Sequence, residues 1–143
     1  MTAEREDLAR RLTLGLGLVN RRLRAGGEGL SVGLASALST VMMHDGIRAS
    51  DLAKFEKVAP PTMTRALADL EARGLVEREA DPADGRASLI RATPQGIKAI
   101  EELRDDRAAR LLTLLDASDD IDVVQLREAV HVVEGLLRAA DSV

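Results

Sequence analysis

The chain contains no cysteine, tryptophan or tyrosine, and its single phenylalanine is Phe55. The lack of cysteine excludes disulfides, cysteine-ligated zinc and thiol-based redox sensing. With so few aromatic residues the core must consist of Leu, Val, Ile, Ala and Met, which suits helices better than a β-sandwich. The sequence also lacks a run of about 18 apolar residues, and residues 1–11 lack the apolar region of a signal peptide. These absences predict a cytoplasmic protein with no membrane partner.

The 143 residues are enough for one modest core, and a content of 45% hydrophobic and 31% charged residues is ordinary for a folded protein. The formal net charge of −4 is unevenly distributed. Residues 1–25 carry six arginines against three acids, whereas residues 92–143 carry six basic residues against eleven acids. Lys57 and Arg65 lie in a stretch without acids, so the negative net charge does not exclude a polyanionic partner.

Apolar residues recur every three or four positions through residues 8–23, which predicts an amphipathic helix. The stripe consists of Leu8, Leu12, Leu16, Val19 and Leu23. The run Gly26-Gly27-Glu28-Gly29 then predicts a break. Ser31 is a predicted N-cap of a second helix, which ends near Asp45-Gly46, and Ser50 is a predicted N-cap of a short third helix.

Pro60 and Pro61 predict the start of a fourth helix. A proline disfavours helical conformation in the residue before it, and the fixed φ of Pro61 suits a first helical turn. Gly74 is typical of the residue that follows the end of a helix. The spacing of the apolar residues predicts that this helix packs inward through Met63, Ala66, Leu67 and Leu70.

Residues 75–79 and 87–92 are predicted strands on either side of Asp84-Gly85, a strong short-range signal for a hairpin. A helix that can enter the major groove, followed by a hairpin with an arginine at its tip, predicts a winged helix-turn-helix. The predicted fold class is therefore mainly α with a small β-hairpin wing (α+β). Residues 31–92 form its predicted DNA-binding core.

Thr93-Pro94 predicts the start of a long amphipathic helix, and Ser118 is the predicted cap of a last one. Together with residues 1–25, the segment 93–143 carries apolar stripes that one small core cannot cover. We therefore predict that these terminal helices form a dimerisation region within a single domain, residues 1–143. A homodimer would present two recognition helices to a pseudo-palindromic operator in double-stranded DNA.

Four residues of the fourth helix's first turn are predicted DNA contacts: Pro61, Thr62, Thr64 and Arg65. Side chains at this end of a recognition helix meet base edges, and backbone N–H groups there are expected to face phosphate. Arg65 can form two hydrogen bonds with a guanine. Pro61 either touches a thymine methyl group or serves only to start the helix.

Arg86 stands at the predicted hairpin tip, where an arginine can enter a narrow minor groove. Lys57 is a further predicted DNA contact. Phosphate contact and simple solvation are alternative interpretations for each of four basic residues: Arg48, Lys54, Lys57 and Arg91.

Asp81 and Asp84 are predicted to orient Arg86 or the hairpin through ion pairs and turn hydrogen bonds, with turn chemistry alone as the alternative. As a catalytic pair they are poor candidates, because an exposed turn offers neither a nucleophile nor a water-excluding pocket. The sequence therefore predicts that the protein is not an enzyme.

No metal or other cofactor is predicted. His44 and His131 are the only histidines, and their separation gives no ligand spacing such as i, i+4. Three acids, Asp119, Asp120 and Asp122, favour the start of a helix through its dipole rather than a calcium site.

With these residues in view, the chain resembles the MarR (multiple antibiotic resistance regulator) family of bacterial repressors. The resemblance rests on Leu52-Ala53, Thr62-Met63-Thr64-Arg65, Leu70-Glu71, Gly74-Leu75-Val76-Glu77-Arg78, Asp81, Asp84, Arg86 and Thr93-Pro94-Gln95-Gly96. It implies an intertwined homodimer whose ligands, often anionic aromatics, bind between the winged core and the dimerisation helices.

Three residues depart from the family pattern. Lys57 stands where many members have a turn glycine, Glu56 replaces a usual apolar residue, and Gly85 stands where an arginine is frequent. The missing wing arginine is expected to lower the affinity for DNA or its salt dependence, although Arg86 retains the key position.

The predicted function is sequence-specific DNA binding by a transcriptional regulator, a repressor that a small anionic or aromatic effector releases from DNA. Because aromatic side chains are nearly absent, Leu and Met would have to supply apolar contacts to such an effector. The alternative is a winged-helix module that binds other proteins and has no specific DNA binding.

Overall fold

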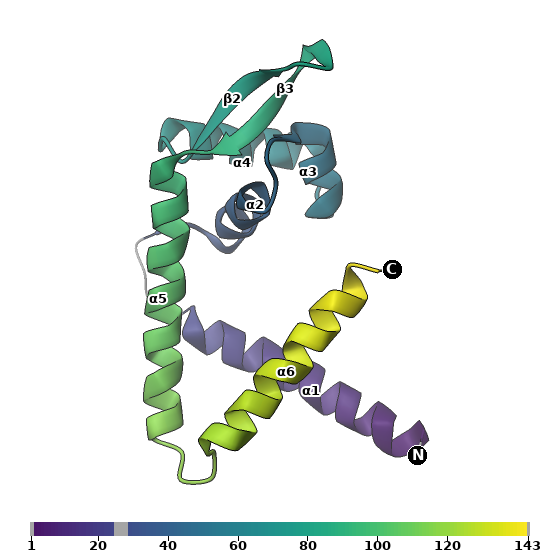
Figure 1. Cartoon of the computed structure of the whole chain (residues 1–143), viewed down its shortest axis with the longest axis vertical. Helices are drawn as coiled ribbons and strands as arrows, with labels where there is room; N and C mark the ends of the chain where they lie inside the picture. Colours follow the sequence, from purple (N-terminus) through teal and green to yellow (C-terminus); the bar gives the residue numbers. More distant parts are fainter. Residues whose placement is uncertain (1, 25–28, 143) are drawn as a thin grey trace. The chain divides into compact units, whose positions relative to one another are not determined.

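The computed structural model describes residues 2–24 and 29–142, so Gly26 to Glu28 of the predicted break lie outside the described residues. Helices and strands follow in the order α1 (Thr2–Leu23), α2 (Val32–Met42), β1 (Ile47–Arg48), α3 (Ala49–Phe55), α4 (Pro60–Ala72), β2 (Val76–Asp81), β3 (Asp84–Ala92), α5 (Pro94–Asp116) and α6 (Val123–Ala140) (Figure 1). The chain divides into two compact units, Met1–Asp106 and Arg107–Val143. The predicted class, mainly α with a small sheet, is confirmed.

The sheet is antiparallel, with β3 between β1 and β2. Pairing of β2 with β3 runs from Val76 opposite Ala92 to Ala80 opposite Ser88, and β1 pairs Arg48 with Leu89. The strand β1 was not predicted from the sequence, because two residues are too few to show an alternating pattern.

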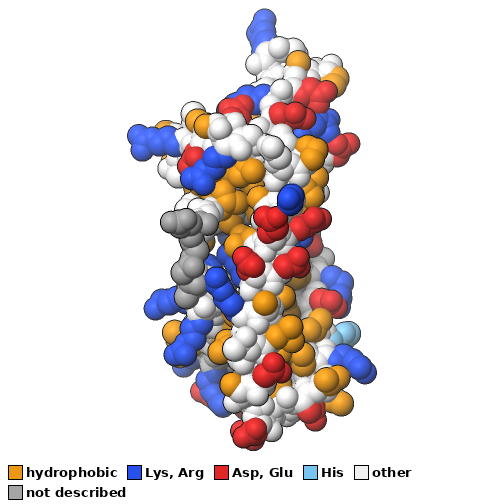
Figure 2. Space-filling view, turned by 90° about the vertical axis from the view of Figure 1, so that its left-hand side faces the viewer, with side chains coloured by type: hydrophobic (Ala, Val, Ile, Leu, Met, Phe, Trp, Pro, Cys, Tyr) orange, Lys and Arg blue, Asp and Glu red, His pale blue; other side chains and the backbone are white. Residues whose placement is uncertain are grey.

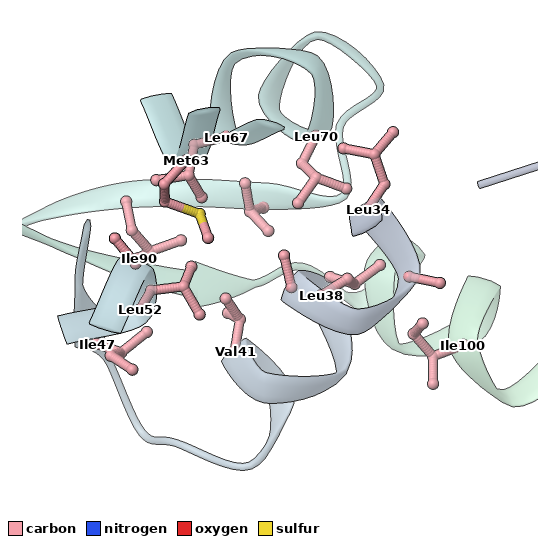
Figure 3. Close-up of a cluster of buried hydrophobic side chains, with 14 residues drawn as sticks. Leu34, Leu38, Val41, Ile47, Leu52, Met63, Leu67, Leu70, Ile90 and Ile100 are labelled. Atoms are coloured by element: carbon pink, nitrogen blue, oxygen red, sulfur yellow. The ribbon is translucent and has the colours of Figure 1, made fainter. Parts of the chain in front are cut away.

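The core of the first unit lies between α2, α3, α4, the sheet and the start of α5 (Figure 3). Its fully buried larger side chains are Leu38, Val41, Leu52, Leu67, Leu70, Ile90 and Ile100. The predicted inward face of α4 is confirmed, since Met63, Leu67 and Leu70 are buried and Ala66 packs against the same cluster. The core therefore holds α4 by one face and leaves the opposite face exposed.

Of the three predicted serine caps, only Ser31 is confirmed, since its Oγ accepts the Leu34 N–H at 3.3 Å. Ser50 lies inside α3, which follows β1 directly, and Ser118 precedes the start of α6. The cap of α6 is Asp122. Its carboxylate accepts the Gln125 N–H at 2.8 Å, and the Gln125 side chain accepts the Asp122 N–H at 2.9 Å. This reciprocal pair satisfies two backbone donors. Ser118 cannot form such a pair, because the residue three positions after it is an isoleucine, whose side chain has no acceptor.

A close contact joins the end of α4 to the start of α5. Gly74 follows α4 with φ +70°, as its predicted role after the end of this helix requires. The Thr93 N–H donates to the Leu75 carbonyl at 3.0 Å, and the Thr93 hydroxyl donates to the Gly74 carbonyl at 2.6 Å. The Gly96 N–H donates to the Thr93 Oγ1 at 3.1 Å. The residues from Thr93 to Gly96 therefore join the start of α5 to Gly74 and Leu75, the two residues between the end of α4 and β2.

The helices α1 and α6 contain no buried residue, and many apolar side chains lie exposed on the protein surface (Figure 2). On these two helices they are Leu8, Leu12, Leu14, Leu16, Leu18, Val19, Val123, Val124, Val130, Val132, Val133, Leu136 and Leu137. The predicted apolar stripes of α1 and α6 thus lack cover within the described part of one chain, whereas Ile100 of the α5 stripe is buried in the core. No helix in that part is both long and apolar enough to cross a membrane.

Candidate nucleic-acid interface

The start of α4 is built from two prolines that follow the extended residue Ala59. Pro60 and Pro61 have no N–H, and the N–H groups of Thr62 and Met63 both donate to the Ala59 carbonyl, at 3.0 and 3.2 Å. The predicted contact between phosphate and the N–H groups of this first turn is therefore wrong, because none of the four residues has an unused backbone donor. At this end of α4 the hydrogen-bond donors that remain available are those of side chains.

The outward face of α4 carries Thr62, Thr64 and Arg65, all exposed, on the side opposite the buried Met63. The Thr64 hydroxyl donates to the Pro60 carbonyl at 3.0 Å, so its oxygen remains available as an acceptor. Within the described residues, Arg65 makes no ion pair, and its guanidinium donors are available to a base edge. This face has the chemistry that the major groove requires.

The turn of the hairpin lies at Pro82-Ala83, so its predicted position at Asp84-Gly85 is wrong. Pro82 has the fixed φ that the second residue of a turn prefers. The Asp81 Oδ1 accepts the Ala83 N–H at 2.9 Å, which closes the turn through a side chain. These two effects favour a turn before the Asp-Gly pair is reached.

Arg86 lies at an irregularity in the hairpin. Ala80 pairs with Ser88, but the next residue, Asp81, pairs with Asp84, so residues 85–87 have no partners opposite them on β2. Arg86 is exposed, its N–H donates to the Asp84 Oδ1 at 3.1 Å, and its guanidinium makes no ion pair with any described residue. The wing thus presents a free cation near its tip.

Asp81 forms an ion pair with Arg48 rather than with Arg86. The Arg48 Nε and Nη2 lie 2.8 and 2.5 Å from the Asp81 Oδ2, and the Asp81 residue is only 7% exposed. The Ala83 N–H and the Arg48 guanidinium hold the pKa of Asp81 below its usual value, because both favour the carboxylate. The Asp84 carboxylate accepts the backbone N–H of Arg86.

Two of the four candidate phosphate contacts are occupied by carboxylates. Arg48 pairs with Asp81, and Arg91 pairs with Asp45 and with Glu79, whose Oε2 lies 2.6 Å from the Arg91 Nε. The two lysine candidates, at positions 54 and 57, are exposed and make no ion pair among the described residues. These pairings were not predicted from the sequence, because the partners lie 33, 46 and 12 residues apart, with no periodic signal to connect them.

Lys57 adopts a left-handed conformation, with φ 54°, in the turn between α3 and α4. Its N–H donates to the Lys54 carbonyl at 3.2 Å, and the Val58 N–H donates to the Ala53 carbonyl at 3.0 Å. This bonding pattern commonly ends a helix with glycine at the left-handed position. The lysine therefore occupies a glycine conformation, which explains why the resemblance places a glycine here.

Glu56, the neighbouring departure, is held by two hydroxyl groups of α2. Ser36 and Thr40 donate to its carboxylate oxygens at 2.6 and 2.5 Å. A polar connection between α2 and the turn thus replaces the apolar contact of the usual residue.

Lys57→Gly is expected to raise the free energy of unfolding by about 1 kcal/mol, because a left-handed conformation strains any residue with a Cβ. Lys54→Gly removes a lysine side chain from the last turn of α3 instead. Because glycine disfavours a helix, this variant is expected to lower the free energy of unfolding by about 1 kcal/mol. Urea unfolding curves measure both. A wild-type midpoint for Lys57→Gly would show that the turn carries no strain.

An exposed face on α4, an arginine on that face without an ion pair among the described residues, and a second such arginine on the wing are typical of a winged helix-turn-helix of the DNA-binding class. Comparisons with known proteins support this class. The family model described as "MarR family" matches residues 30–88. HTH-type transcriptional regulators of Mycobacterium leprae and Mycobacterium tuberculosis are each 34% identical to the chain over 136 residues, which cover 91% of this chain and 92% of the relative.

Solved structures show the same fold. Transcriptional regulator Tm0710 from Thermotoga maritima matches with a TM-score of 0.77 and 21% identity, over 96% of this chain and 99% of the other. Wild-type MarR from E. coli matches with a TM-score of 0.73 and 20% identity, over 91% and 96%. The chain belongs to the MarR family and is a DNA-binding transcriptional regulator.

Proposed function

We propose that the protein is a homodimeric repressor that binds a pseudo-palindromic operator through α4 and the wing. The observation that carries the proposal is the pair of exposed arginines, Arg65 on α4 and Arg86 on β3, neither of which has an ion-pair partner among the described residues. Arg65 reads a base edge in the major groove, and Arg86 enters the adjacent minor groove.

Local charge supports this interface despite the net charge of −4. Several acids nearby are neutralised by arginines, including Asp69 by Arg73 and Glu71 by Arg78, each at 2.7 Å. Lys54 and Lys57 make no ion pair among the described residues and are available to contact phosphate. The acids that remain in excess lie mainly in residues 92–143.

The uncovered apolar faces of α1 and α6 support a homodimer, since burial of apolar surface stabilises association. Sedimentation of the wild-type protein as a well-folded monomer at micromolar concentration would contradict this part of the proposal.

Release by a small molecule is supported by a cavity of about 210 Å³ in the first unit, which Leu30 and Leu103 line with apolar side chains. Glu102 and Asp106 line the same cavity. These two carboxylates oppose an anionic ligand and favour a neutral or cationic apolar one. Adding such compounds to a titration of operator DNA with the protein tests whether they release the protein from DNA.

The experiment that tests the proposed function is a titration of the DNA flanking the protein's own gene, with scrambled competitor, across a series of salt concentrations. Two lysines per subunit in a dimer give about four phosphate contacts, so we expect a slope of log K against log [salt] of about −3 or steeper. Binding that scrambled DNA removes equally would contradict a specific operator at that position. It would favour the alternative, a protein-binding module, for which the relatives' names give no support.

The proposal assigns no catalytic role to Asp81 and Asp84. The Asp81 carboxylate is engaged by Arg48 and by the Ala83 N–H, and the Asp84 carboxylate accepts a backbone N–H. Among the described residues, no group of three metal-ligating side chains could hold a metal ion.

A further inference from the structure

Two arginine bridges connect the wing to the segment that leads into α3. Arg48, the last residue of β1, reaches past β3 to Asp81 at the end of β2. Arg91, on β3, joins Glu79 of β2 to Asp45, which precedes β1. Both bridges therefore link β2 to residues 45–48.

The backbone alone makes a short connection between these parts. Only two residue pairs, Ile47 with Ile90 and Arg48 with Leu89, join β1 to β3. The side chain of Arg48 extends this connection by one more strand. Arg48 is also the N-cap residue of α3, although its side chain makes no capping hydrogen bond.

The Asp81 carboxylate has a partner on each side. Its Oδ2 accepts both Arg48 donors, and its Oδ1 accepts the Ala83 N–H at 2.9 Å inside the turn. A hydrogen-bonded path thus runs from the start of α3, through one carboxylate, to the turn of the wing. Arg86 lies three residues beyond Ala83.

We propose that Arg48 is a positioning residue, which acts on DNA through Arg86 by fixing the wing relative to α3 and α4, and is not a phosphate contact. Arg91 supports the same arrangement through the second bridge. The inference rests on the proposed function, because it assumes that Arg86 contacts DNA. It assigns to Arg48, the ion-pair partner of Asp81, the role of setting the position of the wing.

Asp81→Asn separates positioning from charge, because the two roles predict changes of opposite sign. The substitution removes a negative charge and frees Arg48, so a phosphate-contacting Arg48 would strengthen DNA binding. A positioning role predicts a weakening of about tenfold, comparable to the loss of one good base or groove contact. The control is Asp69→Asn, which breaks the exposed pair between Asp69 and Arg73 at the end of α4. It is expected to leave the affinity unchanged or raised within about threefold.

Arg48→Lys provides a second variant, and because the Arg48 side chain is 40% exposed we expect the protein to fold with this replacement. Lysine retains a charge that binds phosphate but lacks the forked donors that hold a carboxylate. We expect a weakening of about tenfold if Arg48 positions the wing, and little change if it contacts phosphate. Adding Arg86→Ala to either variant is expected to weaken binding no further than Arg86→Ala alone.

Fluorescence anisotropy with operator DNA, alongside thermal unfolding, gives these affinities. Weakened binding by Arg86→Ala, with wild-type affinity for Asp81→Asn and Arg48→Lys, would overturn the inference alone. Additive losses in the double variants would do the same. Wild-type affinity for Arg86→Ala itself would overturn both the proposed wing contact and the inference that depends on it.

Discussion

Gly96→Ala is expected to lower the free energy of unfolding of the winged-helix unit strongly. A Cβ at this position would lie 2.1 Å from the Leu75 carbonyl oxygen, 3.0 Å from its carbon and 3.3 Å from the Leu38 Cδ1. The Leu75 carbonyl cannot move away freely, because it accepts the Thr93 N–H. The backbone of α5 or of the segment after α4 must shift instead. We expect a loss of about 3 kcal/mol or more, a large share of the stability of a small domain.

Urea unfolding followed by circular dichroism measures this loss. The matched control is Gly33→Ala, at the second residue of α2, where an added Cβ meets nothing within 4 Å. Alanine favours the helix there, so we expect a free energy of unfolding that is unchanged or raised by up to about 1 kcal/mol. A wild-type unfolding midpoint for the Gly96 variant would show that the close contact with Leu75 is not required.

Arg65→Ala and Arg86→Ala are each expected to weaken operator binding by about 1–3 kcal/mol. The two losses should differ in character, because the arginines are proposed to read different grooves. Loss of Arg65 should relax the preference for one base pair in each half-site. Loss of Arg86 should reduce the preference for A·T-rich sequence with a narrow minor groove. Both side chains are exposed and unpaired among the described residues, so stability should be unchanged.

The matched control for charge is Arg73→Ala, which removes an arginine from the end of α4 that already pairs with Asp69. It should weaken binding less than either variant, and to a similar extent on all sequences. Competition with operators mutated at single base pairs gives the specificity of each variant. Arg65→Ala with the full wild-type preference at every position would exclude base recognition by this residue.

The sequence was sufficient to predict the elements with a strong apolar period. The inward face of α4 and the stop at Gly74 follow from side-chain spacing and from backbone conformation, both of which are local. The position of the hairpin turn was harder to predict, because two neighbouring pairs of residues both favour a turn. Asp84-Gly85 is a strong hairpin pair, yet the turn forms at Pro82-Ala83, where Asp81 supplies a hydrogen bond as well.

The exposure of the candidate interface residues was predictable from the sequence, but their ion-pair partners were not. The exposure of Thr62, Thr64 and Arg65 follows from the helical period, since the core takes the opposite face. The pairing of Arg48 with Asp81 depends on the order of three strands, one of them only two residues long. No property of either residue alone distinguishes an arginine that holds a carboxylate from one that is free to meet phosphate.

The contact of Thr93 and Gly96 with Gly74 and Leu75 connects the start of α5 to the segment that directly follows α4. Because hydrogen bonds and a close backbone contact join the start of α5 to Gly74 and Leu75, directly after α4, we expect a tilt of α4 to be coupled to a movement of the start of α5. A helix of 13 residues, such as α4, is about 20 Å long, so a tilt of about 5° displaces its far end by roughly 1.7 Å. In the proposed dimer, the arrangement of the two α5 helices would therefore set the spacing of operator half-sites. That spacing is a quantity that operators with inserted or deleted base pairs can measure.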